Sequence, residues 1–288
     1  MTGIVVGVDG SEGGTIALRF AVEEGRLRGW PVTAVLAWDY LDQPRADPSV
    51  AFDPAYDESD AAAWCEAHLA EVLGDSAAGI EKRVVNDKAA PALLDAAAGA
   101  ELLVVGARGL GGFKGLLLGS VSRAVVEHAP CPVAVVHAPR DGEAAPADPP
   151  RVVVGTDGST DALEAMRWAA DEARARGAVL QVVHSWQQPL IGSYMDGAPQ
   201  FDPVEVEGYA RQILDAAVEE LGADDLTVDP QLVTAGSAQA LIDASAGAAL
   251  VVAGHRGRGR LAGFLLGSTS LRVAQHAASP VVLVPHDG

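Results

Sequence analysis

A segment with the glycine and serine spacing of a phosphate-binding loop occurs twice in this chain of 288 residues. The first copy reads Gly-Ala-Arg-Gly at 106–109, then nine residues, then Gly-Ser at 119–120. The second reads Gly-His-Arg-Gly at 254–257, then nine residues, then Gly-Ser at 267–268. Glycine has no Cβ to keep a phosphate from backbone N–H groups, and the N-terminus of a following helix carries partial positive charge. The repeated segment therefore indicates a phosphate-bearing ligand in each half.

An aspartate precedes each glycine-rich segment at the same distance. Asp9 stands in Gly-Val-Asp-Gly-Ser and Asp157 in Gly-Thr-Asp-Gly-Ser. The two aspartates lie 148 residues apart, and so do Gly106 and Gly254, which means that no net insertion separates the landmarks in either half. Such an aspartate can contact a ribose or a metal ion, or it can form an Asx-turn or helix cap, and the sequence favours neither.

The helix that should follow each glycine-rich segment offers hydroxyl groups but no evident catalytic base. Two serines near its start recur in both halves, and they can donate to phosphate oxygens or cap the helix. His255 has Ala107 as its counterpart, so histidine chemistry there would be confined to one half. His128 and His276 do match, but they fall near the helix C-terminus, where a cation is favoured. We assign no catalytic residue.

Composition excludes several classes of protein. The net charge is −19, which disfavours nucleic acid and anionic membranes as partners. The acidic residues are unevenly distributed, however, because residues 102–126 and 244–286 contain no Asp or Glu. Neither GxxxxGK[ST] nor GxGxxG occurs, no apolar run reaches about 18 residues, and the N-terminus lacks the features of a signal peptide. Cys65 and Cys131 form no CxxC pair. We expect a soluble protein of the reducing cytoplasm.

Apolar periodicity predicts alternating strands and helices in two similar halves. In the first half we expect strands at 4–8, 32–37, 80–85, 102–105 and 133–136, with helices at 12–28, 61–73, 91–98 and 120–128. In the second we expect strands at 152–156, 179–184, 228–233, 250–253 and 281–284, with helices at 162–175, 206–221, 238–246 and 268–276. The Pro-, Ala- and acid-rich stretch 138–150 predicts a linker, so we place the domains at 1–146 and 147–288.

In such an α/β fold, a ligand binds beyond the carboxyl ends of the parallel strands. If the first and fourth strands are neighbours, Asp9 and Gly106 share one crevice although they lie far apart in the sequence. The same expectation holds for Asp157 and Gly254.

The pattern G-x2-G-x9-G-[S/T] after an apolar strand, with Val-Gly-Val-Asp-Gly-Ser closing the first strand, resembles the ATP-binding class of universal stress proteins, here as a tandem pair. The resemblance implies two doubly wound, Rossmann-like domains, each a five-stranded parallel sheet of order 3-2-1-4-5. It places adenine near the ends of the first and second strands and phosphates in the glycine-rich loop. It also suggests pairing through the fifth strands within the chain, and across chains in a homodimer.

Carried over by position, the resemblance implies two sets of ATP-binding residues. The first set is Gly7, Val8, Asp9, Ala37, Val105, Gly106, Gly109, Gly119, Ser120, Val121 and Ser122. The second set is Gly155, Thr156, Asp157, Ser185, Ala253, Gly254, Gly257, Gly267, Ser268, Thr269 and Ser270. Ala37 and Ser185 depart from the bulkier apolar residue that often lies near the base.

Three functions are consistent with these residues. The first is an ATP-binding stress-response regulator that acts through ligand-dependent conformation rather than rapid catalysis. The second is a slow ATPase or phosphoryl-transfer enzyme, with Asp9 or Asp157 holding Mg²⁺. The third is a protein-interaction scaffold that uses the long loops 39–57 and 187–204, each of which contains Phe-Asp-Pro.

Overall fold

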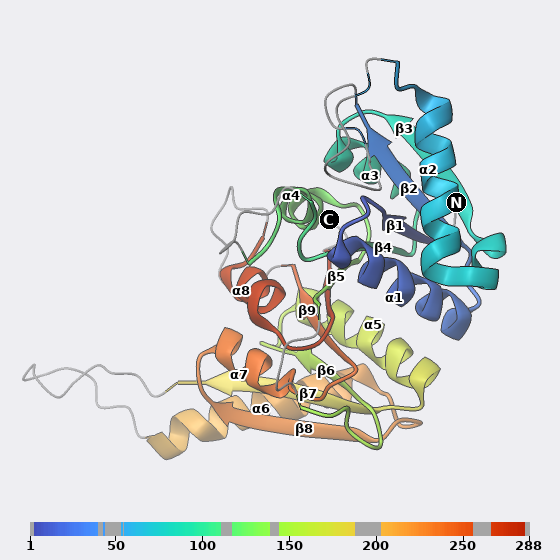
Figure 1. Ribbon diagram of the computed structural model, residues 1–288. Helices are drawn as coiled ribbons and strands as arrows, with labels where there is room; N and C mark the ends of the chain where they lie inside the picture. The colour runs from blue at the N-terminus through green and yellow to red at the C-terminus, as the bar shows by residue number, and fades with distance from the viewer. Residues whose placement is uncertain are drawn as a thin grey trace, which may run out of the picture. The chain divides into compact units, whose positions relative to one another are not determined.

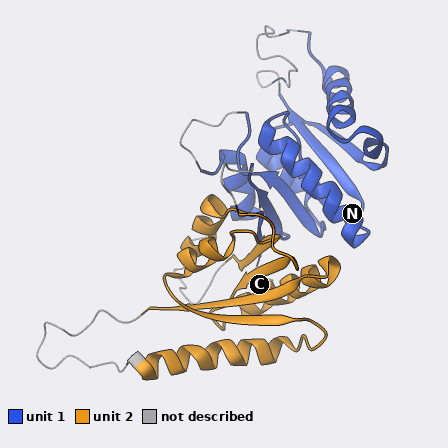
Figure 2. Ribbon diagram, turned by 60° about the horizontal axis from the view of Figure 1, so that its bottom comes forward, with its two compact units in different colours: residues 1–141, 280–285 blue, residues 142–279, 286–288 orange. Residues whose placement is uncertain are grey.

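The chain consists of two compact units (Figures 1 and 2). Unit 1 comprises residues 1–141 and 280–285, and unit 2 comprises residues 142–279 and 286–288. The computed structural model describes residues 3–39, 43, 53, 55–110, 117–138, 144–187, 203–255 and 266–285. The predicted domain boundary between residues 146 and 147 stays a prediction.

Unit 1 is a parallel sheet with the strand order β3-β2-β1-β4-β5. Its strands are β1 (Ile4–Gly7), β2 (Val32–Trp38), β3 (Glu81–Asn86), β4 (Leu102–Gly106) and β5 (Val133–Val136). Its helices are α1 (Glu12–Arg28), α2 (Glu58–Leu73), α3 (Ala89–Ala96) and α4 (Ser120–His128), and a 3₁₀ helix, η1 (Gly74–Gly79), follows α2. The predicted α/β fold and the strand order 3-2-1-4-5 are confirmed.

The helices of unit 1 cover both faces of its sheet. Helix α1 contacts α2 and helix α3 contacts α4, and the two pairs lie on opposite sides of the strands (Figure 1). Strands β1, β4 and β5 are almost wholly buried because both of their faces are covered. Their near-continuous apolar sequences follow from that position.

A sixth strand joins unit 1 from the other end of the sequence. Strand β10 (Val281–Val284) pairs with β5 in the antiparallel sense, with Val282 opposite Ala134. This is the pairing of the two fifth strands that the family resemblance suggested. Strand β10 therefore belongs to unit 1, although it follows the last helix of the second repeat in the sequence.

Unit 2 repeats the first four strands in the order β8-β7-β6-β9. Its strands are β6 (Arg151–Gly155), β7 (Val179–Trp186), β8 (Val228–Thr234) and β9 (Leu250–Gly254). Its helices are α5 (Thr160–Arg176), α6 (Pro203–Leu221), α7 (Ser237–Ala244) and α8 (Ser268–His276). Among the described residues, no helix is both long enough and apolar enough to cross a lipid bilayer.

The long helices begin and end where their capping residues require. Ser11 caps α1 by accepting a hydrogen bond from the Gly14 N–H at 2.9 Å, and Ser159 caps α5 in the same way through Ala162. Gly177 ends α5 in the left-handed conformation at φ 59°. These local signals fix where each helix leaves the carboxyl end of its strand, which is where the candidate sites lie.

Close packing of α1 on β4 depends on two glycines. A Cβ on Gly106 would lie 2.5 Å from the backbone carbon of Gly13, and a Cβ on Gly13 would lie 2.1 Å from the carbonyl oxygen of Arg108. Helix and strand therefore meet backbone to backbone at the start of the glycine-rich segment.

Cys65 and Cys131 are both buried free thiols, and burial raises the pKa of each to about 11.

Candidate functional site

Unit 2 contains a cavity of about 330 Å³ at the carboxyl ends of β6, β7 and β9. The predicted residues of the second site line it, apart from Gly257, which lies outside the described residues. These are Gly155, Thr156, Asp157, Ser185, Ala253, Gly254, Gly267, Ser268, Thr269 and Ser270. The topology thus gathers four separate segments into one wall, as expected when the first and fourth strands are neighbours.

Five further residues that sequence reasoning missed complete the wall: Ala162, Val183, His184, Ser237 and Leu241. Leu241 projects from α7 towards β6, because a Cβ on Gly155 would lie 2.8 Å from its Cδ1 atom. Nothing in the sequence marks Leu241 or Ser237, since their relevance comes from the way α7 packs beside the strand ends.

The wall of this cavity includes the start of helix α8, whose N-cap residue is a glycine without a side chain to cap the first backbone amides. Gly267 occupies the N-cap position of α8, and no side chain makes a capping hydrogen bond there. The Ser270 hydroxyl instead donates to the carbonyl oxygen of Gly254 at 2.6 Å, and Gly267 N–H donates to His255 O at 2.8 Å. The helix N-terminus is therefore open to an anion, which its partial positive charge would favour.

Unit 1 repeats this arrangement at the start of α4. Gly119 is the N-cap without a side-chain capping bond, and the Ser122 hydroxyl donates to Gly106 O at 2.7 Å. Because each hydroxyl donates to a carbonyl oxygen, neither Ser122 nor Ser270 acts as a helix cap.

A second feature that the two units share is a glycine packed against a leucine. Gly7 faces Leu93 as Gly155 faces Leu241, with 3.1 Å between the position of a Gly7 Cβ and Leu93 Cδ1.

Asp9 connects the first strand to the glycine-rich segment. Its Oδ1 atom accepts hydrogen bonds from Ser11 N at 2.9 Å and Ser11 Oγ at 2.6 Å, and its Oδ2 atom accepts from Leu110 N at 3.2 Å. Asp157 likewise accepts a hydrogen bond from Ser159 N at 3.0 Å. Both aspartates form the Asx-turn that the sequence allowed, and Asp9 in addition holds the loop after β4.

The other predicted residues of the first site lie on the same segments: Gly7, Val8, Ala37, Val105, Gly106, Gly109, Gly119, Ser120, Val121 and Ser122 follow or end β1, β2 and β4, or begin α4. A cavity of about 410 Å³ lies beside this loop, but Gly109 is the one predicted residue that lines it. Ser11, Glu12, Arg108 and His137 form much of its wall. This cavity therefore lies next to the predicted first site rather than within it.

An aromatic cluster covers the β1–α1 turn in unit 1. The Trp38 and Tyr56 rings meet edge to face with centroids 5.5 Å apart, and the Trp64 and His68 rings stack at 4.9 Å. Trp64 also lies over Gly10, where a Cβ would come within 2.8 Å of its ring. Burial raises the pKa of Tyr56 to about 12 and lowers the pKa of His68. Trp38 is thus part of the core.

His184 fixes the corresponding turn in unit 2. Its buried ring places Nδ1 2.8 Å from the carbonyl oxygen of Thr156, which requires a proton on that nitrogen.

In the part of the chain that the structure describes, no group of three or more His, Cys, Asp or Glu residues is placed to hold a metal ion. Residues 188–202, and most of 40–54, which make up most of the two predicted long loops, lie outside the described residues.

Comparison with known proteins identifies related chains over nearly the full length. The model of the Universal stress protein family matches residues 1–137 and 150–285. A universal stress protein of Mycolicibacterium smegmatis is 34% identical over 288 residues, covering 98% of this chain and 96% of the relative. One from Mycobacterium tuberculosis is 32% identical over 303 residues, covering 98% and 95%.

Solved structures agree on the fold. The crystal structure of a universal stress protein from Archaeoglobus fulgidus matches with a TM-score of 0.68 and 21% identity, covering 98% of both chains. One from Pseudomonas aeruginosa matches with a TM-score of 0.64 and 18% identity, covering 99% of this chain and 92% of the other.

Proposed function

Because this chain belongs to the universal stress protein family, we propose that it is a stress-response protein that binds ATP in each half. ATP would act by changing the conformation or stability of the unit that holds it, without rapid turnover. The observation that carries this proposal is the cavity of unit 2, whose wall contains both a helix N-terminus with a glycine N-cap and apolar side chains.

The two parts of the cavity wall suit the two ends of a nucleotide. Gly254, Gly267 and the first residues of α8 would hold the triphosphate through backbone amides. Val183 and Leu241 supply apolar surface for the base. The volume of about 330 Å³ lies at the lower end of the range usual for small-molecule sites. We assign Asp157, which also lines the cavity, to the ribose.

Unit 1 supports a second site by repetition of the same backbone geometry. The open start of α4, the Ser122–Gly106 hydrogen bond and the contact of Leu93 with Gly7 each have a direct counterpart in unit 2. We therefore assign to the first site the residues that the sequence predicted for it.

A charge placed at the helix N-terminus tests the proposal without disturbing the fold. Ser268 is the first residue of α8, is exposed and lines the cavity. An Asp there is favourable for the helix but repels a bound triphosphate. We expect isothermal titration calorimetry with ATP to show about two equivalents per chain, and Ser268→Asp to weaken one class of sites about tenfold, as about 1.4 kcal/mol would.

Gln212→Glu is the matched control, because it adds one negative charge on an exposed position of α6 outside the cavity wall. It should leave both classes of sites unchanged. Absence of ATP binding in the unaltered chain, or equal binding by all three proteins, would contradict the proposal.

A further inference from the structure

A pair of hydrogen-bonded hydroxyls forms part of the wall of the unit 2 cavity. Ser185 is near the end of β7 and Ser237 is the first residue of α7, and the Ser185 Oγ donates to the Ser237 Oγ at 2.9 Å. Both residues line the cavity beside Val183 and Leu241. Ser185 is half-buried and Ser237 is exposed, so the pair stands at the rim of the space rather than within the core.

The first repeat has no such pair. At the offset of 148 residues, Ser185 corresponds to Ala37 and Ser237 to Ala89, which is likewise the first residue of its helix, α3. The apolar part of the wall is retained, because Leu93 approaches Gly7 as Leu241 approaches Gly155. The two repeats therefore share the shape of this wall but differ in its hydrogen-bonding capacity.

The chemistry of two linked hydroxyls defines what they can recognise. Each serine hydroxyl carries one proton and two lone pairs. When one donates to the other, the pair retains one free O–H donor and one oxygen free to accept, side by side. The hydroxyl protons can rotate so that either serine is the donor. The pair thus fits a ligand edge that presents one donor next to one acceptor, as the 6-amino group and adjacent ring nitrogen of adenine do.

We propose that Ser185 and Ser237 read the 6-substituent of the purine bound in unit 2, and that the two nucleotide sites of this chain consequently differ in base selectivity. This proposal rests on the proposed function, since it requires a nucleotide with its phosphates at the start of α8. Unit 1, with Ala37 and Ala89, holds the base by apolar contact and discriminates less between purines that differ in the 6-substituent.

The size of the effect follows from the position of the pair. A hydrogen bond contributes a modest net free energy when water can replace it, and the rim is open to water. We expect Ser185→Ala with Ser237→Ala to weaken ATP binding in unit 2 by about threefold to tenfold. Binding of purine riboside triphosphate should weaken less than ATP binding does, because this analogue keeps the ring nitrogen that accepts from the pair but lacks the 6-amino group that donates to it.

The experiment uses the full chain and calorimetric titration with each of the two triphosphates. Three variants are compared with the unaltered protein: the double alanine variant, the reciprocal variant Ala37→Ser with Ala89→Ser, and Gln239→Ala. Gln239 lies on α7 but is exposed and outside the cavity wall, so it controls for changes in that helix. The reciprocal variant should raise the preference of the weaker-discriminating site for ATP, and Gln239→Ala should alter neither preference.

The possible outcomes distinguish a failure of this selectivity proposal from a failure of the proposed ATP-binding function. If neither triphosphate binds the unaltered chain, the proposed function fails and this inference fails with it. If both triphosphates bind but the double alanine variant weakens them equally or not at all, the function stands and the selectivity proposal is overturned. Should the double alanine variant misfold, as far-ultraviolet circular dichroism would reveal, an unchanged preference in the reciprocal variant overturns it instead.

Discussion

At the scale of single residues, the glycines of the loop are required by neighbouring atoms. A Cβ on Gly109 would lie 2.4 Å from Asp9 Oδ2, and that oxygen is already held by the Leu110 N–H. We predict that Gly109→Ala displaces the loop, breaks this hydrogen bond and lowers the free energy of unfolding of unit 1 by about 1–3 kcal/mol. Urea unfolding followed by tryptophan fluorescence measures this change.

Gly79→Ala is the control for that substitution. No heavy atom lies within 4 Å of the position that its Cβ would take, so it should change the unfolding free energy by less than about 0.5 kcal/mol. Equal effects of the two substitutions would show that the contact with Asp9 does not restrain the loop.

The residues of the candidate site divide by how they could be recognised. Asp157, Gly254 and Ser270 carry a repeated sequence pattern, and neighbouring parallel strands bring them together. Ser237 and Leu241 carry no local signal, because a serine and a leucine in a short helix serve equally well as surface and core. The Trp64–His68 stack could not be predicted either, since it depends on which face α2 turns towards the β1–α1 turn.

At the scale of elements, several helix ends were predicted to the residue because caps and breakers are local, and the other ends differ by one to three residues. Helix α1 spans the predicted residues 12–28, and α4 and α8 also match their predictions. Helix α2 begins three residues before its prediction, at Glu58, because Asp57 and Asp60 form a capping box. The 3₁₀ helix η1 was missed, since a single short turn has no periodicity to read.

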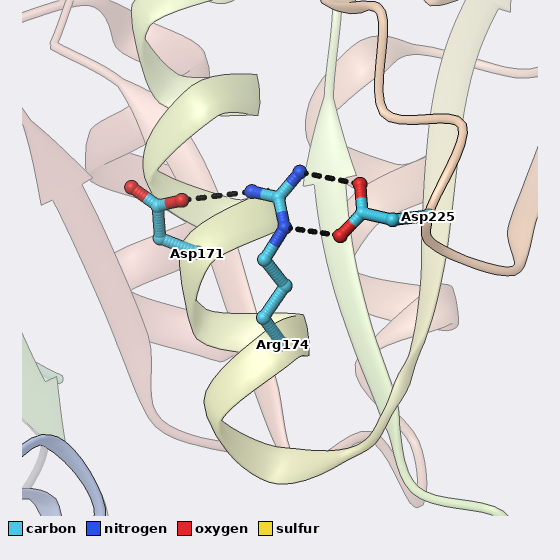
Figure 3. A network of polar contacts seen from close by, with 3 residues as sticks. All are labelled: Asp171, Arg174 and Asp225. Carbon is cyan, nitrogen blue, oxygen red and sulfur yellow. Dashed lines mark hydrogen bonds and ion pairs between the residues drawn. The ribbon is translucent and has the colours of Figure 1, made fainter.

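An exposed ion-pair network ties one end of α5 to the turn before β8 (Figure 3). Arg174 donates to both carboxylate oxygens of Asp225, at 2.7 and 2.8 Å, and to Asp171 at 2.8 Å. The hydrogen bonds from this guanidinium lower the pKa of Asp225 from its ordinary value to about 2 and outweigh the desolvation that opposes them. We predict that Arg174→Gln returns this pKa towards the ordinary value, as carboxyl carbon NMR titration would show.

The same shift fixes the direction of the pH dependence. Because the folded-state pKa of Asp225 is depressed, its stabilising contribution is present above the unfolded-state value and is lost as the pH falls through about 2. Asp225→Asn should therefore destabilise the protein slightly at pH 7, with an effect that shrinks in high salt. A titration in which Arg174→Gln leaves the Asp225 pKa unchanged would show that the bidentate contact does not form in solution.

At the scale of the whole molecule, the constant offset of 148 residues predicts two similar halves, and the alternation of strands and helices predicts a parallel sheet in each. The strand order itself was expected only from the family resemblance. The strand that pairs with the last strand cannot be predicted from the repeat or from the order of elements. Apolar runs such as residues 133–136 and 281–284 specify burial, but they carry no register or direction of pairing. The antiparallel β5–β10 pair was expected from the family resemblance alone.

This pairing makes the stability of unit 1 depend on the far end of the chain. Val281, Val282 and Leu283 are fully buried, and β10 pairs along the outer side of β5. Deleting residues 280–288 leaves β5 as an unpaired apolar edge, which favours association with other chains. We predict that the truncated protein self-associates in sedimentation velocity and that the β5 amides, at Val133–Val136, lose protection in hydrogen exchange. Substituting Pro285 by Ala, just beyond the pair, should do neither. A truncated chain that stays monomeric with β5 protected would show that unit 1 is complete without its sixth strand.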